Sequence, residues 1–402
     1  MEKHKLDSIM GFLLGSIILV PFKIKPVLVA LFFSYALFFI VKRKERFSIK
    51  SLKRTVFMSL LFVPLIISVF YSYNVERGIN YLIRSLPLLS IPMSFTFLKR
   101  ESKKTIIYTF IPVFVMTNAL YVILMLLYIL QLGYLRTEHD LYYYYSFITY
   151  EFYHIGDHPI YLSVQFVLAL FLLFNSKFFS IVQKTILFTV LFFGMFFLAR
   201  KGVILSFIIL LPFYLINIIK SKLVMIGSIS IVIVAFFAFM FVPEIKKRYA
   251  ELCNKESYVK NETSSTGIRL VLWENSLELI KESPIFGYGI GDIQDLLSQQ
   301  MKSNGFLVLA ERKSNCHNQY LQFLMSIGLI GLGLFIISMY YYFNRFKNEN
   351  NILGSTVLIF FLLLFMTESF LDRQNGIILF STFMSILFFK KNNKEVVSKI
   401  TQ

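Results

Sequence analysis

The sequence is poor in the residues and motifs from which many soluble catalytic sites are built. Its 402 residues include two cysteines, five histidines and one tryptophan, and only 16% of residues are charged. It contains no Walker loop, no paired-cysteine motif and no serine, histidine and aspartate in hydrolase-triad order. These absences exclude P-loop, zinc-ribbon and serine-hydrolase sites of the kinds that sequence motifs identify. No internal repeat, low-complexity linker or terminal soluble domain is visible either.

Long hydrophobic runs are what the sequence has instead. Hydrophobic residues make up 56% of the chain, far more than in a soluble domain of this length. The runs are continuous and do not alternate, so each predicts a helix that can cross roughly 30 Å of hydrocarbon. The predicted fold class is all-α, a polytopic membrane helical bundle with about twelve transmembrane helices. The expected spans are 8–22, 26–41, 55–73, 79–97, 105–131, 160–174, 185–199, 202–219, 223–242, 318–343, 352–370 and 376–389.

Lysine and arginine are unevenly distributed between the loops. If the N-terminus is cytoplasmic, the loops on that side hold 23 of the 41 Lys and Arg residues, and the short opposite loops hold seven. This bias predicts that both termini are cytoplasmic. The long loop at 243–317 holds ten basic and ten acidic residues. The net charge of +18 therefore reflects topology and attraction to anionic membrane lipids, and no nucleic-acid partner is expected.

The loop lengths divide the chain into three segments. Residues 1–242 are expected to hold the first nine transmembrane helices, and 243–317 to form a large extracytoplasmic loop. Residues 318–402 are expected to hold the last three helices and a cytoplasmic tail. Lys3 and Lys5 precede the first hydrophobic run, but no small-residue cleavage site follows it, so we expect a retained anchor.

The long loop is predicted to form short helices that lie flat on the outer leaflet, without becoming an independent domain. Hydrophobic residues recur with helical spacing over 268–281, and Pro284 ends that helix. A glycine-rich turn follows at 287–291, and Asp292 is placed to cap a second helix over 292–302. The turn has two interpretations, a phosphate cradle at a helix start or a tight turn at the membrane surface.

His317 closes the long loop directly before a predicted span. A lone histidine at an interface is often structural, but this one lies on the same side as Arg200 and Arg269. A neutral imidazole there can act as a general base. Arg200 and Lys201 end a span, where they either reach the interface or hold a diphosphate through the guanidinium fork. Arg269, on the predicted loop helix, is either a solvated residue or part of the same anion site.

Three further polar residues have competing interpretations. Arg84 lies within a span, where a charge costs roughly 2.5–3.5 kcal/mol on insertion scales, so it needs a hydrated cavity or a partner such as Glu368. His154 and His158 are four residues apart, which is compatible with a metal site. Pro159 disfavours helical geometry at His158, however, and no third histidine is close. We expect neither a metal nor another cofactor.

The residues of the outer loops bear on disulfide formation and on the kind of donor used. Cys253 and Cys316 both fall in the long loop, where they form either a disulfide or ordinary thiols. The outer loops contain no Asp-x-Asp string, which argues against metal-dependent transferases that use nucleotide sugars. A donor used on that face must carry its own activation.

Four motifs occur in order within residues 267–331. They are Gly267-Ile268-Arg269-x3-Trp273, Ser283-Pro284-x2-Gly287-x-Gly289-x-Gly291, His317-Asn318-x-Tyr320-Leu321 and Gly328-x2-Gly331. Together they resemble the signature of the O-antigen ligase/polymerase superfamily. Ala199-Arg200-Lys201-Gly202 resembles the family's Ser-Arg-Gly element, from which Lys201 departs. His158-Pro159-x-Tyr161-Leu162-Ser163 and Glu368-x4-Arg373-Gln374-x-Gly376 resemble two further family elements.

The resemblance implies a fold, an activity and residue roles. Members are bacterial inner-membrane proteins with a fold of the membrane glycosyltransferase C type (GT-C-like). They transfer a glycan from undecaprenyl pyrophosphate to a periplasmic acceptor, without metal and with inversion. Lipid A–core is the acceptor of ligases. The implied catalytic residues are His317, which orients or deprotonates the acceptor hydroxyl, and Arg200 and Arg269, which stabilise the departing pyrophosphate. The predicted substrate-binding residues are His158, Lys201, Trp273, Tyr320 and Arg373, which lie in these motifs, and Arg84, which lies within an expected span.

The motifs leave the exact activity open. A polymerase of the same superfamily, which joins lipid-linked repeat units, is the close alternative to an O-antigen ligase. A flippase or transporter is more distant, because it would need charged residues deep in several spans and internal symmetry. In this sequence the ionisable residues gather mostly at the outer ends of the predicted spans.

Overall fold

A computed structural model describes residues 2–43, 49–133, 141–218 and 259–390. Every regular element within these ranges is a helix, which confirms the all-α prediction for this part of the chain. The expected span at 223–242 and Cys253 lie outside the described residues. The α-helices are α1 (Glu2–Gly15), α2 (Lys25–Arg43), α3 (Ile49–Met58), α4 (Phe62–Val69), α5 (Val75–Ser85), α6 (Pro87–Phe97), α7 (Arg100–Gln131), α8 (Leu141–Tyr150), α9 (Pro159–Phe174), α10 (Ile181–Phe197), α11 (Lys201–Ile218), α14 (Ser265–Glu282), α15 (Ile293–Ser303), α16 (Leu307–Arg312), α17 (Gln319–Asn348), α18 (Ile352–Phe365) and α19 (Gln374–Phe389). Short 3-10 helices are η1 (Ile17–Leu19), η2 (Phe22–Ile24), η3 (Phe152–His154) and η5 (Phe370–Asp372).

Local capping signals set several helix ends. The Asn318 side chain accepts hydrogen bonds from the backbone N–H groups of Tyr320 and Leu321, at 2.9 and 3.1 Å, and so begins α17. Ser180 and Gln183 form a reciprocal capping box at the start of α10. These side chains satisfy backbone donors that have no partner within the helix.

Fewer helices than expected are long and apolar enough to cross a membrane. Among the described residues, four pass: η2 together with α2 over 22–42, α7, α11 and α17. α3 and α4 add a fifth only if their 63° bend is counted within one broken span. α9, α10, α18 and α19 are apolar but have only 14–17 residues, or about 21–26 Å. The expected count of twelve spans is therefore not confirmed.

Three expected spans are interrupted in the structure. The run 55–73 bends between α3 and α4. The run 79–97 is divided between α5 and α6, and Pro87 takes the first position of α6, where its missing N–H costs no helical hydrogen bond. The first run, 8–22, ends its α-helix at Gly15 and continues as η1. Hydrophobicity predicted where these runs lie but not where their backbone turns.

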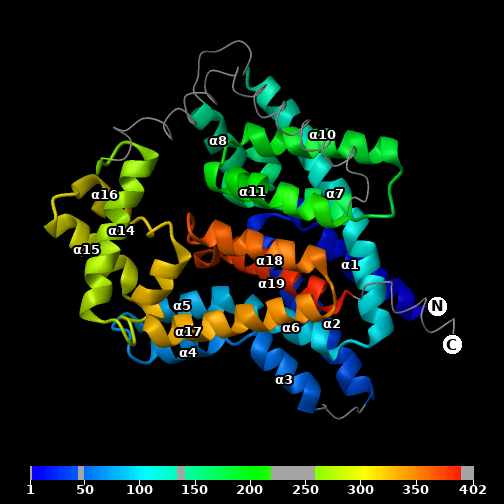
Figure 1. The fold of residues 1–402 in the computed structure, drawn as a ribbon, viewed down its shortest axis with the longest axis horizontal. Coiled ribbons are helices and arrows are strands. Elements are labelled where there is room, and N and C mark those ends of the chain that lie inside the picture. Colours follow the sequence, from blue (N-terminus) through cyan, green and yellow to red (C-terminus); the bar gives the residue numbers. More distant parts are fainter. Residues whose placement is uncertain (1, 44–48, 134–140, 219–258, 391–402) are drawn as a thin grey trace.

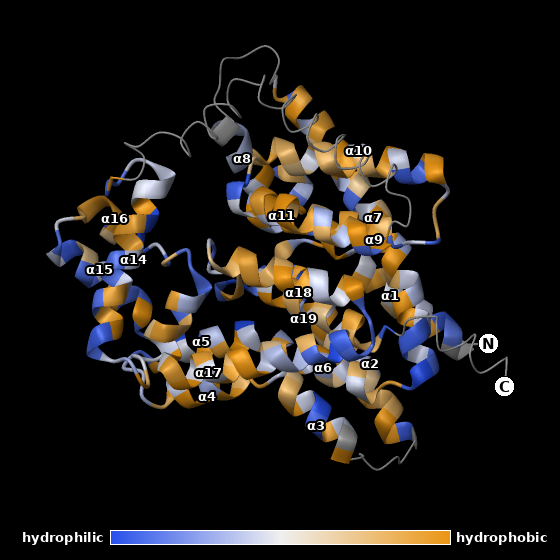
Figure 2. Cartoon of the chain, in the orientation of Figure 1, coloured by the Kyte–Doolittle hydropathy of each residue, from blue (hydrophilic) through white to orange (hydrophobic). Residues whose placement is uncertain are grey.

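The short apolar helices form the centre of the bundle. α9 is buried along almost its whole length, from Pro159 to Leu173, and α19 is buried from Asn375 to Phe388. A helix that is hydrophobic on every side is expected to be surrounded by other helices or by lipid. In Figure 2 hydrophobic residues are concentrated on the bundle helices, including α10, α11 and α18.

α14, α15 and α16 form a separate group at one end of the molecule (Figure 1). The start of α1 lies at the opposite end. Leu272, Leu297 and Met301 are buried in a small hydrophobic core of this group, which Met325 of α17 joins to the bundle. The predicted helix at 268–281 is confirmed as α14. We expected these helices to lie flat on the membrane surface, and we did not predict that they would share a hydrophobic core.

The glycine-rich turn packs against a break in α17. The N–H groups of Tyr288 and Gly289 donate to the carbonyl oxygens of Met325 and Ser326, at 2.8 and 2.9 Å. Gly328 interrupts α17 with φ 61° and ψ −165°, a conformation that is essentially restricted to glycine. The turn's donors are thus used within the protein, which contradicts the phosphate-cradle interpretation and supports the tight turn. This contact ties the α14–α15 connection to the helix that begins after His317.

Candidate functional site

The site is built around the carboxylate of Glu368. Its Oε1 accepts a hydrogen bond from Arg269 Nη2 at 2.8 Å, and its Oε2 lies 3.0 Å from His317 Nδ1. The Glu368 side chain is 18% exposed and that of His317 37% exposed. Because the carboxylate holds Nδ1, Nε2 is the ring nitrogen left to meet a substrate.

Two long-range contacts bring these residues together. Arg269 Nε donates to the carbonyl oxygen of Thr367 at 3.4 Å, and the Asn318 N–H donates to Ser369 Oγ at 3.1 Å. The residues on both sides of Glu368 are therefore fastened to α14 and to the start of α17. His317 itself has a left-handed backbone, with φ 49°, a strained conformation that persists where the surrounding contacts hold it.

Glu368 is ionised in this environment. Burial alone would raise the pKa of its carboxyl, but the hydrogen bond from His317 and the charges of His317, Arg269 and Arg200 outweigh burial. Together they lower the pKa from 4.5 to about 2. Glu368 is therefore an anion at neutral pH that is held between an arginine and a histidine.

Arg200 belongs to the same site. Its guanidinium carbon lies 5.0 Å from the centre of the Tyr145 ring, within cation–π range. Its charge contributes to the lowered pKa of Glu368. The neighbouring Gly202 lies directly against the Thr367 side chain. A Cβ at this position would meet that side chain, so glycine permits the Arg200 segment to approach the Glu368 segment. Lys201 is the first residue of α11.

A cavity of about 510 Å³ opens beside His317 and Glu368. We call it the cationic cavity. His317, Glu368 and Asp372 line it from the C-terminal half of the chain, and His158 lines it from the start of α9. Five basic side chains against two acidic ones give its walls a positive charge. The basic side chains are Arg77, Arg84, Arg312, Lys313 and Arg373.

The basic residues of the cavity divide into two groups. Arg77 and Lys313 both form ion pairs with Asp295. No carboxylate forms an ion pair with the arginines of the second group within the described ranges. A guanidinium that lines a cavity without a carboxylate partner can accept an anionic ligand without first losing an internal ion pair. The arginines of this second group are Arg84, Arg312 and Arg373.

The predicted pair between Arg84 and Glu368 is wrong. Glu368 is occupied by Arg269 and His317. Arg84 instead donates from Nε to the carbonyl oxygen of Asn80 at 3.3 Å, and its guanidinium lies 5.4 Å from the Tyr81 ring centre. The hydrated alternative for Arg84 agrees with its position in the wall of the cationic cavity.

His158 enters the cavity as a neutral imidazole. It precedes Pro159 with an extended backbone, as the proline requires, and its Nδ1 accepts the N–H of Ile160 at 3.4 Å. Burial, followed by the charges of Arg200 and Arg373, lowers the pKa of His158 from 6.5 to about 4. Within the ranges that the structure covers, no three His, Cys, Asp or Glu side chains are grouped as a metal would require. The metal interpretation of His154 and His158 has no ligand set there.

Trp273 and Tyr320, predicted to bind substrate, make scaffold contacts instead. Trp273 Nε1 donates to the Cys316 carbonyl oxygen at 3.0 Å, and Tyr320 Oη donates to the Leu362 carbonyl oxygen at 2.9 Å. Neither is among the residues that line the cationic cavity. Trp273 therefore holds the segment that carries His317. Cys316 is a buried thiol, whereas its potential disulfide partner lies outside the described residues.

Sequence reasoning missed two acidic residues of this site. Glu368 was expected to neutralise Arg84, and Asp372 was not singled out. The Asp372 carboxylate accepts hydrogen bonds from Asn315 and Gln322, at 3.1 and 3.3 Å. The available signal was a pair of acidic residues, four apart, in a short segment between two hydrophobic runs. Such residues are costly near hydrocarbon unless they face a polar site.

The observed features define a helical membrane protein with a basic cavity and a carboxylate-bound histidine. Residues 185–336 match a family model described as O-Antigen ligase, and this region includes Arg200, Arg269 and His317. An uncharacterized protein of Haemophilus influenzae (strain ATCC 51907 / DSM 11121 / KW20 / Rd) is 32% identical over 179 residues. That match covers 41% of this chain and 45% of the relative. The family model thus supports the resemblance to the O-antigen ligase superfamily over residues 185–336, which are less than half of the chain.

Proposed function

We propose that the protein is an O-antigen ligase-type glycosyltransferase that moves a glycan from undecaprenyl pyrophosphate to lipid A–core or another glycan acceptor. The observation that carries this proposal is the imidazole of His317, fixed by ionised Glu368 at the edge of a cavity in which three arginines have no ion-pair partner among the described residues. Proton transfer and stabilisation of a diphosphate leaving group need these two features side by side.

The reaction is a single displacement at the anomeric carbon of the donor sugar. His317 Nε2 takes the proton of the acceptor hydroxyl as the hydroxyl oxygen attacks. The new glycosidic bond forms while the bond between the anomeric carbon and the diphosphate oxygen breaks. Direct attack inverts the configuration of that carbon, and undecaprenyl diphosphate leaves with the bonding electron pair. The protein needs no metal for these steps if its arginines balance the charge that develops on the leaving oxygen.

The arginines divide this work. Arg269 is bound to Glu368, so it acts as a positioning residue that keeps the carboxylate against His317. Arg84 and Arg373, without ion-pair partners among the described residues, are free to take the diphosphate oxygens in bidentate contacts. Arg200 contributes positive potential from the Tyr145 side. This assignment changes the role that the sequence suggested for Arg269.

Neutral His158 complements the arginines. With its Nδ1 directed at the Ile160 N–H, its Nε2 is the ring nitrogen available to the cavity, where it donates a hydrogen bond to a sugar or phosphate oxygen. A neutral donor adds no further charge to the cavity. It therefore orients the substrate without strengthening ground-state binding of the diphosphate as much as another cation would.

The topology follows from the same proposal. The cavity faces the periplasm, both termini are cytoplasmic, and the protein resides in the bacterial inner membrane. Residues 1–242 and 318–402 are the membrane segments, with a GT-C-like arrangement, and 243–317 form the periplasmic loop. The excess of Lys and Arg in the expected cytoplasmic loops supports this orientation.

The test is transfer by the purified protein in lipid nanodiscs. The donor is a defined glycan on undecaprenyl diphosphate, and the acceptors are lipid A–core in one series and a second lipid-linked repeat unit in another. We expect transfer to lipid A–core; elongation of the lipid-linked repeat alone would identify a polymerase. His317→Ala is expected to abolish transfer, whereas the matched variant His154→Ala, in an exposed 3-10 turn, retains it. Normal turnover by folded His317→Ala would remove the proposed site.

A further inference from the structure

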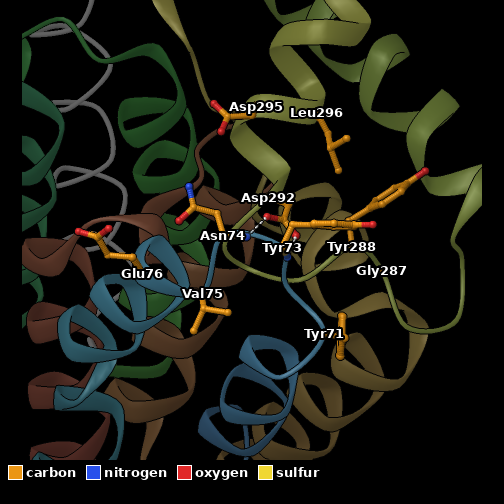
Figure 3. Close-up of a pocket in the computed structure, with 10 residues that line it drawn as sticks. All are labelled: Tyr71, Tyr73, Asn74, Val75, Glu76, Gly287, Tyr288, Asp292, Asp295 and Leu296. Carbon is orange, nitrogen blue, oxygen red and sulfur yellow. Dashed lines mark hydrogen bonds between the residues drawn. The ribbon is translucent and has the colours of Figure 1, made fainter.

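A second hollow, of about 910 Å³, lies next to the cationic cavity. It includes Asp292, Asp295 and Leu296, at the start of α15, whereas Ile293 and Leu297 of the same segment line the cationic cavity. Figure 3 shows three tyrosine side chains on one side of this hollow and Glu76 on the other. We call it the tyrosine groove, after Tyr71, Tyr73 and Tyr288.

Two of the three tyrosine rings are held in place by hydrogen bonds from their hydroxyl groups. Tyr71 Oη donates to the Phe286 carbonyl oxygen at 2.7 Å, and Tyr288 Oη donates to Glu282 Oε2 at 2.8 Å. Tyr73 is fully exposed, but its backbone N–H donates to the Asp292 carboxylate at 2.7 Å (Figure 3). The rings of Tyr71 and Tyr288, fixed in this way, lose little conformational freedom when a ligand packs against their faces. The Tyr73 ring is open to a ligand, and only its backbone is fixed.

Polar groups that can bind hydroxyls surround the rings. The Glu76 carboxylate forms no ion pair within the described part of the chain. The Asn74 side-chain oxygen accepts the Arg77 N–H, which leaves its NH₂ group directed elsewhere. The groove therefore combines apolar ring faces, carboxylate acceptors and an amide donor. A pyranose has C–H groups on its faces and hydroxyls around its edge, so its chemistry is complementary to this set.

One ion pair connects the groove to the cationic cavity. Asp295 lines the groove, and it pairs with Arg77, which lines the cavity. Lys313, also in the cavity wall, binds the same carboxylate at 3.2 Å. A chain that leaves the cavity past this ion pair reaches the groove without crossing the hydrophobic core.

We propose that the tyrosine groove binds the uncharged part of the donor glycan, several sugars away from the diphosphate. This inference rests on the proposed function, because a lipid-linked donor places its diphosphate in the cationic cavity and its sugar chain outside. The carboxylates of Glu76 and Asp292 repel phosphate and uronic acid groups. The groove therefore takes neutral or amino sugars, and it is poorly suited to the anionic headgroups of membrane lipids.

The experiment compares donors of two lengths in the nanodisc transfer assay. One carries a neutral disaccharide on undecaprenyl diphosphate, and the other carries a neutral octasaccharide built from the same repeat. The measured quantity is the ratio of kcat/KM for the long donor to that for the short donor. We expect Tyr73→Ala to lower this ratio about tenfold, mainly through the KM of the long donor, as loss of an aromatic binding contact does. Tyr150→Ala, at an exposed tyrosine outside the groove, is the matched control and keeps the wild-type ratio.

The outcomes separate the two proposals. If the wild-type protein transfers neither donor, the proposed function fails. If it transfers both and Tyr73→Ala leaves the ratio unchanged, the groove does not bind the glycan. If Tyr73→Ala lowers kcat/KM for both donors equally, the groove does not bind the distal part of the glycan, which also overturns the inference. A second variant, Tyr288→Leu, is expected to lower the same ratio. An octasaccharide that contains uronic acids should gain less from its length than the neutral one.

Discussion

Replacing Glu368 by glutamine tests the centre of the site. The substitution keeps the size and shape of the side chain but removes the negative charge that Arg269 and His317 share. The lowering of the Glu368 pKa from 4.5 to about 2 corresponds to roughly 3 kcal/mol of favourable interaction with the ionised form. If most of this interaction orients and stabilises the catalytic imidazole, kcat/KM falls about 100-fold. KM for the donor should change little, since Glu368 does not contact the donor in the proposed mechanism.

The assay is transfer of a labelled glycan from undecaprenyl diphosphate by protein in nanodiscs. Glu274→Gln is the matched control, because Glu274 also forms an ion pair, with Lys260, but lies exposed on α14. The activity of this variant should remain within about twofold of wild type. Comparable unfolding temperatures would show that both variants fold. Wild-type kcat in folded Glu368→Gln would refute the idea that this carboxylate positions His317.

Acid pH offers an independent check on Glu368. Its pKa is lower in the folded protein than in an unfolded chain, so the ionised carboxylate stabilises the fold at pH values above 4.5. This stabilisation is lost as the pH falls from 4.5 toward about 2. Thermal unfolding of wild type and Glu368→Gln in detergent should therefore converge over this window. A difference in unfolding temperature that stays constant across this window would indicate that the glutamine destabilises the protein for a reason other than loss of the negative charge.

The remaining predictions concern the cavity, its histidine and the glycine contact. Arg84→Ala and Arg373→Ala should each raise KM for the donor roughly 10-fold, and donor titrations would show this. As the pH is lowered from 6.5 to about 4, the unfolding temperature of His158→Gln should fall less than that of wild type. In this range His158 takes up a proton in the unfolded chain but not in the folded protein, which destabilises the wild-type fold. Gly328→Ala, whose Cβ would meet the Ile285 carbonyl, should cost about 2–3 kcal/mol in unfolding measurements, whereas Gly333→Ala, with open space around it, should not. Chelators should leave transfer unchanged; strong inhibition would restore the metal interpretation.

The sequence predicted the helical class and the loop helices well. Hydrophobic periodicity placed one helix at 268–281, and α14 spans Ser265–Glu282. Asp292 does precede α15, but its carboxylate accepts the N–H groups of Tyr73 and Asn74 and does not cap the helix. The local sequence pattern predicted α15, but it did not predict that the Asp292 carboxylate would bind the distant turn at Tyr73 and Asn74.

Predictions of span number failed for a physical reason. Hydropathy records how apolar a run is, and an apolar run can cross lipid, turn within the protein or pack in its centre. α9 and α19 are apolar because other helices surround them, although they are too short to span hydrocarbon without tilt or distortion. The helices on either side of the bend, α3 and α4, both pack against α17, a contact that no local pattern of residues 55–73 contains.

The candidate site was predicted in outline through the resemblance. Arg200, Arg269 and His317 do converge on one place, since Arg269 and His317 bind the Glu368 carboxylate and the charge of Arg200 acts on it. Their arrangement was not predicted, because charge alone did not show which arginine Glu368 would neutralise. The choice is made by backbone contacts: Arg269 reaches the Thr367 carbonyl, and Ser369 binds the Asn318 N–H. These contacts join residues that are 98 and 51 positions apart in the chain, beyond the range of local sequence reasoning.

The distribution of charge explains why the site needs so many cations. Arg269 is committed to Glu368, and Arg77 and Lys313 are committed to Asp295. A diphosphate drawn to these residues would have to compete with carboxylates that are already bound and partly desolvated. The arginines without ion-pair partners can bind it at lower cost, so the paired cations serve geometry while the unpaired ones serve the ligand. Asp295, which binds two of the cations at the cavity wall, also lines the tyrosine groove and so joins the two hollows.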